Sequence, residues 1–487
     1  MRKLLLASAA MAAGSLGLAG VANAQFANVN QTPISNQAGA FGTATPSYTP
    51  GPGSVTVRLN GRIAVDVAVA GDSGKNPSAP GTNAKQDPYG IQSYARLFPG
   101  FDGIAGNGLR YGASLEIRQD NAVAPGGGAF GSISGSNRSR AALYWRREMA
   151  YVGIDGVGTV RFGSADGPIG LFYTGAFENF STGGFNGDLP SFFTGGASPA
   201  YPFPGQGVLY TTEKVMYLSP QFFGVDFGVA FEPGTGAVNG TGGNCSVTTA
   251  PSASGLTGNF VTGGATGCDS ASSTGLFGES ARRRNTIDAQ IRYRGAFGPV
   301  GLAVTGGWMT GGHVGYNGAA VGSAAFNTAT AGGQFKGIDI YDAGLQVTYG
   351  GLAVGGHITG GADNSGFALL REGQKKSFAW LVGSSYAFGQ FIVGASYFNF
   401  QYAGSQTRAN NAFVGQNRDD GFAAGGTWTF APGMNVFVDY LYGRRNASNV
   451  NLLTGTAGTT VATGAGGQRL NNHTQVQGLL LGTAFRW

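Results

Sequence analysis

The chain of 487 residues is short of charge and of long apolar runs, and each shortage excludes a class of protein. Charged residues make up only 11%, and a formal net charge of +6 is too mild and scattered for a nucleic-acid-binding protein. After residue 24 no apolar run reaches about 18 residues, so no transmembrane helix is expected. A soluble exported enzyme of this length would usually carry more charge and clear helical blocks.

Catalytic and metal-binding patterns are also missing. The three histidines, His313, His357 and His473, lie far apart, and no G-x-S-x-G, H-E-x-x-H or phosphate-binding G-K-[ST] motif is present. Glu116 and Glu148 could form a paired-carboxylate site, but both lie on arginine-rich faces, which favours salt-bridged structural residues. We therefore expect no enzyme, no catalytic residue, no metal and no cofactor.

Cysteine is nearly absent. Cys245 and Cys268 are the only two, and both lie in the Gly/Ser/Thr-rich segment 233–280. In an oxidising compartment they are expected to pair, closing a loop of about 24 residues that contributes about 3 kcal/mol on the chain-entropy model. Two isolated cysteines without a nearby histidine are poor candidates for a metal site.

The N-terminus indicates export. Residues 1–24 carry Arg2 and Lys3, an apolar run and an Ala-Asn-Ala sequence, the pattern of a secretory signal peptide cleaved after Ala24. Residues 25–53 contain four prolines and no periodicity, so they are expected to form an irregular arm.

What the sequence has in abundance is glycine, with 89 residues, and alternation of polar and apolar positions. In residues 54–70, SVTVRLNGRIAVDVAVA, valine, leucine and isoleucine occupy one parity and polar residues the other. Because successive side chains of a strand point to opposite faces, this segment is expected to be a strand with one apolar and one arginine-bearing face. The same alternation recurs in later segments, although 391–402 shows it poorly.

Eight long polar connections alternate with seven short turns, which predicts about 16 antiparallel strands. An even strand number with long loops on one side and short turns on the other is the plan of a transmembrane β-barrel, so the expected fold class is all-β, with the barrel over 54–487. The last strand is expected to close the sheet against the first. Its outward residues would be Leu479, Leu481, Phe485 and Trp487.

Several segments resemble the trimeric general-diffusion porins of Gram-negative bacteria. They include VRLNGRIAVDV, YARLFPGFDG, NGLRYGASLEIR, AYVGIDGVGTVRFG, VMYLSPQFFGVDFGVAF and the C-terminal GLLLGTAFRW, in family-like order over about 54–487. The resemblance implies an outer-membrane, water-filled channel for passive diffusion of small hydrophilic solutes and ions. It also implies contact with outer-membrane lipid, a homotrimer, and recognition of the C-terminal strand by the barrel-assembly machinery.

In that family the third long loop folds into the barrel and narrows the pore, with basic wall residues facing acidic groups. The matching loop is about 164–211, and it resembles the family loop at DLPSF, with Ser191 where a glutamate is common. Arg62 and Arg96 match family pore positions by motif. The remaining candidates are the basic residues Arg58, Arg118 and Arg161, placed by parity, and the acidic residues Glu116, Asp166, Glu178 and Asp188.

Two positions depart from the family pattern, since Glu148 and Tyr210 stand where basic residues are frequent. The basic wall is therefore expected to be thin, with Arg146 and Lys214 as nearby substitutes.

Two other functions remain open. A substrate-specific channel for sugars or organic acids would use the loop aromatics Phe177, Phe180, Phe185, Phe192 and Phe193. The other alternative is an exported Gly-rich structural or adhesive surface protein.

Overall fold

The computed structural model describes the strands and part of one long connection. The described residues are 51–73, 87–119, 144–175, 178–193, 197–203, 212–234, 283–313, 336–365, 367, 369–370, 374–403, 408–409, 412–413, 416–447 and 472–487. The expected signal peptide, most of the arm, both cysteines, Phe177 and Tyr210 lie outside them. Within the described residues, no helix is long and apolar enough to cross a membrane.

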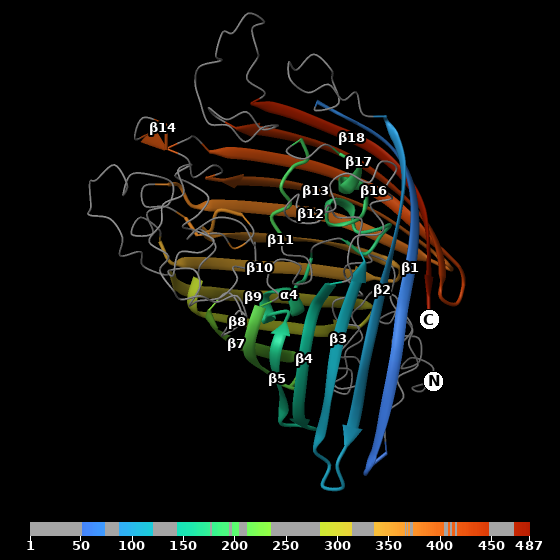
Figure 1. The fold of residues 1–487 in the computed structure, drawn as a ribbon, viewed down its shortest axis with the longest axis vertical. Coiled ribbons are helices and arrows are strands. Elements are labelled where there is room, and N and C mark those ends of the chain that lie inside the picture. The colour runs from blue at the N-terminus through green and yellow to red at the C-terminus, as the bar shows by residue number, and fades with distance from the viewer. Residues whose placement is uncertain are drawn as a thin grey trace, which may run out of the picture.

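Sixteen of the described strands close into one antiparallel barrel (Figure 1). This confirms the all-β barrel of about 16 strands expected from the alternation of long and short connections. Two further short strands, β14 and β15, pair only with each other. The strand bounds are β1 (Ser54–Asp72), β2 (Tyr89–Ile104), β3 (Arg110–Gln119), β4 (Tyr144–Ile154), β5 (Gly158–Ala165), β6 (Thr212–Leu218), β7 (Val225–Gly234), β8 (Arg283–Phe297), β9 (Val300–His313), β10 (Ile338–Tyr349), β11 (Leu352–Ala362), β12 (Ser377–Phe388), β13 (Phe391–Tyr402), β14 (Arg408–Ala409), β15 (Ala412–Phe413), β16 (Asn417–Ala431), β17 (Met434–Ala447) and β18 (His473–Arg486).

Strand β1 shows how the sequence assigns the two faces. Val57 and Val69 are 80% and 58% exposed, whereas Arg62 and Asp66 are 3% and 0% exposed. Since the sheet is closed, the exposed apolar parity faces outward and the buried polar parity faces the interior. The arginines of the inner parity are therefore kept away from the apolar outer surface.

The barrel closes where the last strand pairs with the first. Val67 lies opposite Leu481, and the pairing continues to the chain end, where the Trp487 backbone N–H donates to the Gly61 carbonyl at 3.2 Å. Glycine is required at position 61, because a Cβ there would lie 2.3 Å from the Trp487 ring. The indole of the final residue thus fills the space left by a missing side chain on β1.

The long connection between β5 and β6 contains three short helical elements, α4 (Pro168–Leu171), η3 (Gly184–Asn186) and η4 (Leu189–Phe192). It contacts inward-facing groups on several strands. Ile169 N donates to Asp288 of β8 at 2.9 Å, and Thr182 Oγ1 donates to Asp439 of β17 at 2.9 Å. The segment therefore lies against the inner face of the barrel, as its green trace in Figure 1 shows.

Aromatic side chains pack this segment onto the wall. Phe180, Phe185 and Phe193 are only 0%, 8% and 7% exposed, and all three belong to one buried cluster. Phe185 makes an edge contact with Phe398 of β13, with ring centroids 5.2 Å apart. These rings form a core between loop and wall, so they are not available as the aromatic track of a substrate-specific channel.

Candidate functional site

Four arginines form a single row across the inner wall. Strand register places Arg118 of β3 opposite Arg96 of β2, Arg96 opposite Arg62 of β1, and Arg62 opposite Arg486 of β18. Neighbouring strands lie about 4.8 Å apart, so the row spans about 14 Å. The row runs from the long-loop end of β3 to the short-turn end of β18. Because barrel strands tilt, residues in register on successive strands lie at different heights along the barrel axis.

Tyr94 connects the middle of this row to the long connection. The guanidinium carbons of Arg62 and Arg96 lie 5.0 and 4.6 Å from its ring centroid, and Arg62 Nη2 donates to Tyr94 Oη at 2.7 Å. Tyr94 Oη in turn donates to the carboxylate of Asp188 at 3.1 Å. Asp188 therefore lies beside the basic row, with only a phenol between its carboxylate and Arg62.

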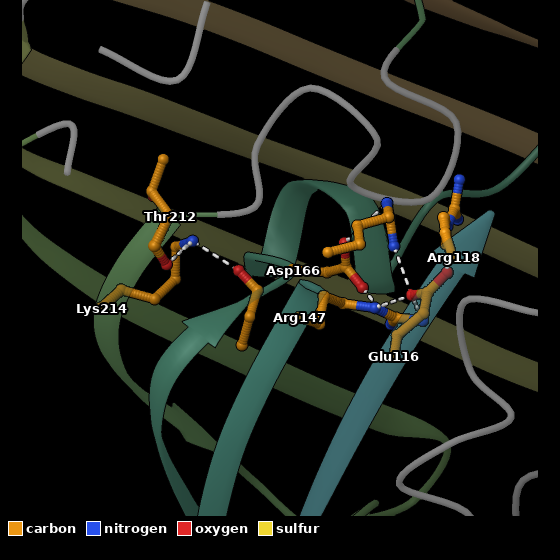
Figure 2. Close-up of polar contacts among 8 residues, drawn as sticks. Glu116, Arg118, Arg147, Asp166, Thr212 and Lys214 are labelled. Atoms are coloured by element: carbon orange, nitrogen blue, oxygen red, sulfur yellow. Dashed lines mark hydrogen bonds and ion pairs between the residues drawn. The ribbon is translucent and has the colours of Figure 1, made fainter. Parts of the chain in front are cut away.

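A second cluster surrounds Glu116 at the upper end of the row (Figure 2). Its carboxylate accepts hydrogen bonds from Arg118, from Arg146 at 2.8 Å and from Arg147 at 2.5 Å. Arg147 and Arg146 also donate to Asp166, at 2.5 and 3.5 Å. Three arginines thus share two carboxylates, which leaves a local excess of positive charge.

A β-bulge explains how consecutive residues reach the same carboxylate. Glu116 pairs with Arg147 while Ile117 pairs with Trp145, so Arg146 is an extra residue in β4. The extra residue turns both arginines inward and exchanges the two faces for the rest of the strand. Glu148 consequently pairs with outward-facing Leu115 and is exposed on the outer surface. Its predicted place on the arginine-rich inner face is therefore wrong.

The other basic candidates lie nearby but are held differently. Arg58 Nε forms an ion pair with Asp102 at 2.6 Å, below the row on β1. Arg161 is 3% exposed on the inner parity of β5. Lys214 Nζ donates to the Ala165 carbonyl at 2.5 Å (Figure 2), so its ammonium fastens the ends of β5 and β6.

Among the acidic candidates, Glu178 is held within the long connection itself. It accepts a hydrogen bond from Asn186 at 3.1 Å. Its neighbour Tyr201 is partly buried, and desolvation together with this carboxylate raises the pKa of the Tyr201 phenol well above its usual value. Glu116 and Asp166 instead contact arginines directly, and Asp188 is joined to Arg62 through Tyr94.

Aspartates of β8, β16 and β17 hold the long connection. Besides Asp288 and Asp439, the Asp419 carboxylate of β16 accepts the Ala200 N–H at 2.8 Å. All three aspartates are 0% exposed. Each of these carboxylates therefore accepts a hydrogen bond from the segment.

Sequence reasoning missed Arg486 and Arg147. A signal for Arg486 was present, because Leu479, Leu481 and Phe485 occupy the opposite parity of the last strand. No parity signal could have found Arg147, because the bulge at Arg146 shifts the alternation within β4.

The chain is similar to known proteins in sequence and in structure. The family model for Gram-negative porin matches residues 4–478. No curated protein matches significantly. Similar solved structures include an anion-selective porin from Comamonas acidovorans, at 15% identity and a TM-score of 0.49, covering 89% of this chain and 100% of that one.

Two other similar structures have lower scores. A mutant of the Rh. blastica porin has 12% identity and a TM-score of 0.44, covering 89% of this chain and 100% of that one. A loop-deletion mutant of OmpT, an outer membrane protein of Vibrio cholerae, has 13% identity and a TM-score of 0.42, covering 89% and 99%. The family model covers nearly the whole sequence, and the chain therefore belongs to the Gram-negative porins, channel-forming barrels of the outer membrane.

Proposed function

We propose that the row Arg118–Arg96–Arg62–Arg486 gives this porin a preference for small anions and anionic solutes. The row itself is the observation that carries the proposal: four guanidiniums on adjacent strands face the interior at one register level. Fixed charges lining a water-filled pore raise the local concentration of the opposite ion. Solutes move down their gradients, and no covalent step is involved.

The long connection between β5 and β6 would narrow this pore and set its size limit. Hydrogen bonds to β8, β16 and β17 support a fixed position, and Tyr94 and Gln92 hold its other side against β2. Asp188 would then partly offset Arg62 at the constriction, because the two groups share Tyr94.

Ion selectivity in planar bilayers tests the proposal. In a salt gradient, the refolded protein should give a reversal potential on the anion side. The double substitution R62E/R96E should move that potential toward cations, because it changes the sum of the row's formal charges from +4 to zero. The control R292Q removes an arginine that is already paired with Asp226 at 2.6 Å and should shift the potential much less. Stepwise conductance with an unchanged reversal potential in R62E/R96E would overturn the role of the row.

A homotrimer is proposed on the family resemblance and on the outer surface of β4, β5 and β6. Strands β5 and β6 have only 8 and 7 residues, whereas a membrane-spanning strand needs about 9–11. Glu148 is exposed outward here, and Glu213 lies two strands away through Ser164. Charged side chains facing lipid are costly, so a neighbouring subunit is the better cover for this sector. Cross-linking of the folded protein should trap trimers.

Export would follow the route implied by the termini. Residues 1–24 would be removed as a signal peptide, and the last strand, with Leu479, Leu481, Phe485 and Trp487 on its outward parity, would be presented to the barrel-assembly machinery. N-terminal sequencing of the mature protein should begin at Gln25.

A further inference from the structure

The inner wall carries an apolar patch at the long-loop ends of β9 and β10, formed by Met309, Ile338 and Ile340. Met309 of β9 lies opposite Ile340 of β10 in register, and Ile338 shares the parity of Ile340. All three are almost fully buried, whereas the outward neighbours Trp308 and Tyr341 are 43% and 56% exposed. Because the interior of such a barrel is polar and water-filled, this β9–β10 patch needs a cover.

The connection between β11 and β12 provides the cover. Phe367 and Leu369 are 4% and 0% exposed and belong to the same buried cluster as the β9–β10 patch. The backbone holds the segment over the start of β10, because the Lys336 N–H donates to the Leu370 carbonyl at 2.7 Å. The β11–β12 connection therefore turns into the barrel and packs on its inner wall.

This packed region lies across the barrel from the arginine row. In the closed strand order, β9 is eight strands from β1 in either direction, and β10 is eight strands from β2. Sixteen strands about 4.8 Å apart enclose a barrel about 24 Å across or wider. The β9–β10 patch is thus separated from Arg62 and Arg96 by more than the Debye length of about 10 Å in 0.1 M salt.

We propose that Phe367 and Leu369 form a second barrier of the pore, which closes the β9–β10 side of the lumen and directs solutes past the arginine row. This inference rests on the proposed pore function. Closely packed apolar side chains exclude water, so ions do not pass between the β11–β12 connection and the β9–β10 patch. The space that stays open lies nearer the row and within its field. The two residues thereby help to set both the size limit and the ion preference.

Single-channel conductance in planar bilayers and liposome swelling with sugars of increasing size test the barrier. In F367A/L369A the β9–β10 patch loses its cover, so conductance should rise and trisaccharides should enter faster, relative to monosaccharides, than in the wild type. The reversal potential should move toward zero, because the added aqueous cross-section lies far from the arginine row.

The matched control F378A/L345A truncates the same two residue types on the outer faces of β12 and β10, where Phe378 and Leu345 are exposed. It should change none of these measurements. Heat-modifiable mobility in gel electrophoresis reports whether each variant is folded. The milder variant L369A, which keeps Phe367 in place, should show the same changes to a smaller extent and replaces the double variant if that one does not fold.

A further variant separates this barrier from the β5–β6 connection, because Ile169 of α4 belongs to the same buried cluster. I169A keeps Phe367 and Leu369 over the β9–β10 patch, so it should change conductance less than F367A/L369A does. An equal change would show that the cluster acts by positioning α4 and would overturn the second barrier.

Unchanged or lower conductance in a folded F367A/L369A protein would also overturn the barrier. The conductance and reversal potential of the wild-type protein test the proposed pore function by themselves. A failure of the barrier would therefore leave that function standing.

Discussion

Arg146 and Arg147 both donate to the carboxylate of Glu116, although they are consecutive residues of one strand. In a regular strand they would point to opposite faces, and one of them would lie on the outer surface. A regular alternation would place Arg146 and Arg147 on different faces of the sheet. The bulge in β4 therefore brings both charges to the inner wall.

The first prediction concerns this carboxylate. The substitution E116Q removes the acidic group that Arg118, Arg146 and Arg147 share, although Arg146 and Arg147 keep their ion pairs with Asp166. Removing one partner of a buried ion pair costs about 3–5 kcal/mol. E116Q should lower the temperature at which the folded band disappears in gel electrophoresis and should move the reversal potential further toward anions.

The control for E116Q is E148Q, which removes a carboxylate from the outer surface of the same strand pair. It should leave the reversal potential unchanged. An E116Q protein with wild-type heat stability would contradict the central role given to this carboxylate.

The second prediction concerns the end of the arginine row. R486Q should move the reversal potential toward cations by less than R62E/R96E, because it removes one charge from the edge of the row. Reversal potentials in a salt gradient, compared with those of R292Q, measure the difference. If R486Q and R292Q behave alike, Arg486 does not belong to the functional row.

The third prediction is a pH dependence. Burial raises the pKa of the Tyr201 phenol well above its usual value, and the pKa of Tyr173 is raised in the same direction for the same reason. Above about pH 10 the unfolded chain loses these protons while the folded protein keeps them, so stability falls as pH rises. Thermal unfolding between pH 8 and 11 should show this fall, with a shallower slope in Y201F.

The comparison with Y201F isolates one phenol, because every exposed tyrosine is common to both proteins. Identical slopes would show that Tyr201 ionises as readily in the folded protein as in the unfolded chain.

The fourth prediction concerns the seam between the first and last strands. In G61V the new side chain would overlap the Trp487 ring, and overpacking of this kind costs about 1–3 kcal/mol. Refolding yield and heat stability should fall. The matched control is G71V on the same strand, where a Cβ meets nothing within 4 Å. The substitution G61V should cost less stability in a W487A background than in the wild type, because the indole that it overlaps is then absent.

The sequence predicts the barrel well, because one buried and one exposed face per strand imposes a period of two. In β1 every valine, leucine and isoleucine from Val55 to Val69 lies on the exposed parity. The pattern fails in β13 for a physical reason. Its outward face carries Phe391 and Val393, but its inner face carries Phe398 and Phe400, which are buried in the cluster formed with the long connection.

The candidate site was less accessible to sequence reasoning. Parity could place Arg62 and Arg96 on the inner face, but only register shows that they share one level with Arg118 and Arg486. Likewise, composition shows that the long connection contains Asp188, but only its fold shows that this carboxylate lies against the basic side through Tyr94.

The seam between β1 and β18 also has a consequence for synthesis. Arg62 comes from the first strand and Arg486 from the last, so the arginine row is complete only when β1 and β18 pair. A chain that stops a few residues early would lose Trp487 from the Gly61 notch and one end of the charged wall together. The proposed selectivity thus depends on closure of the barrel at this seam.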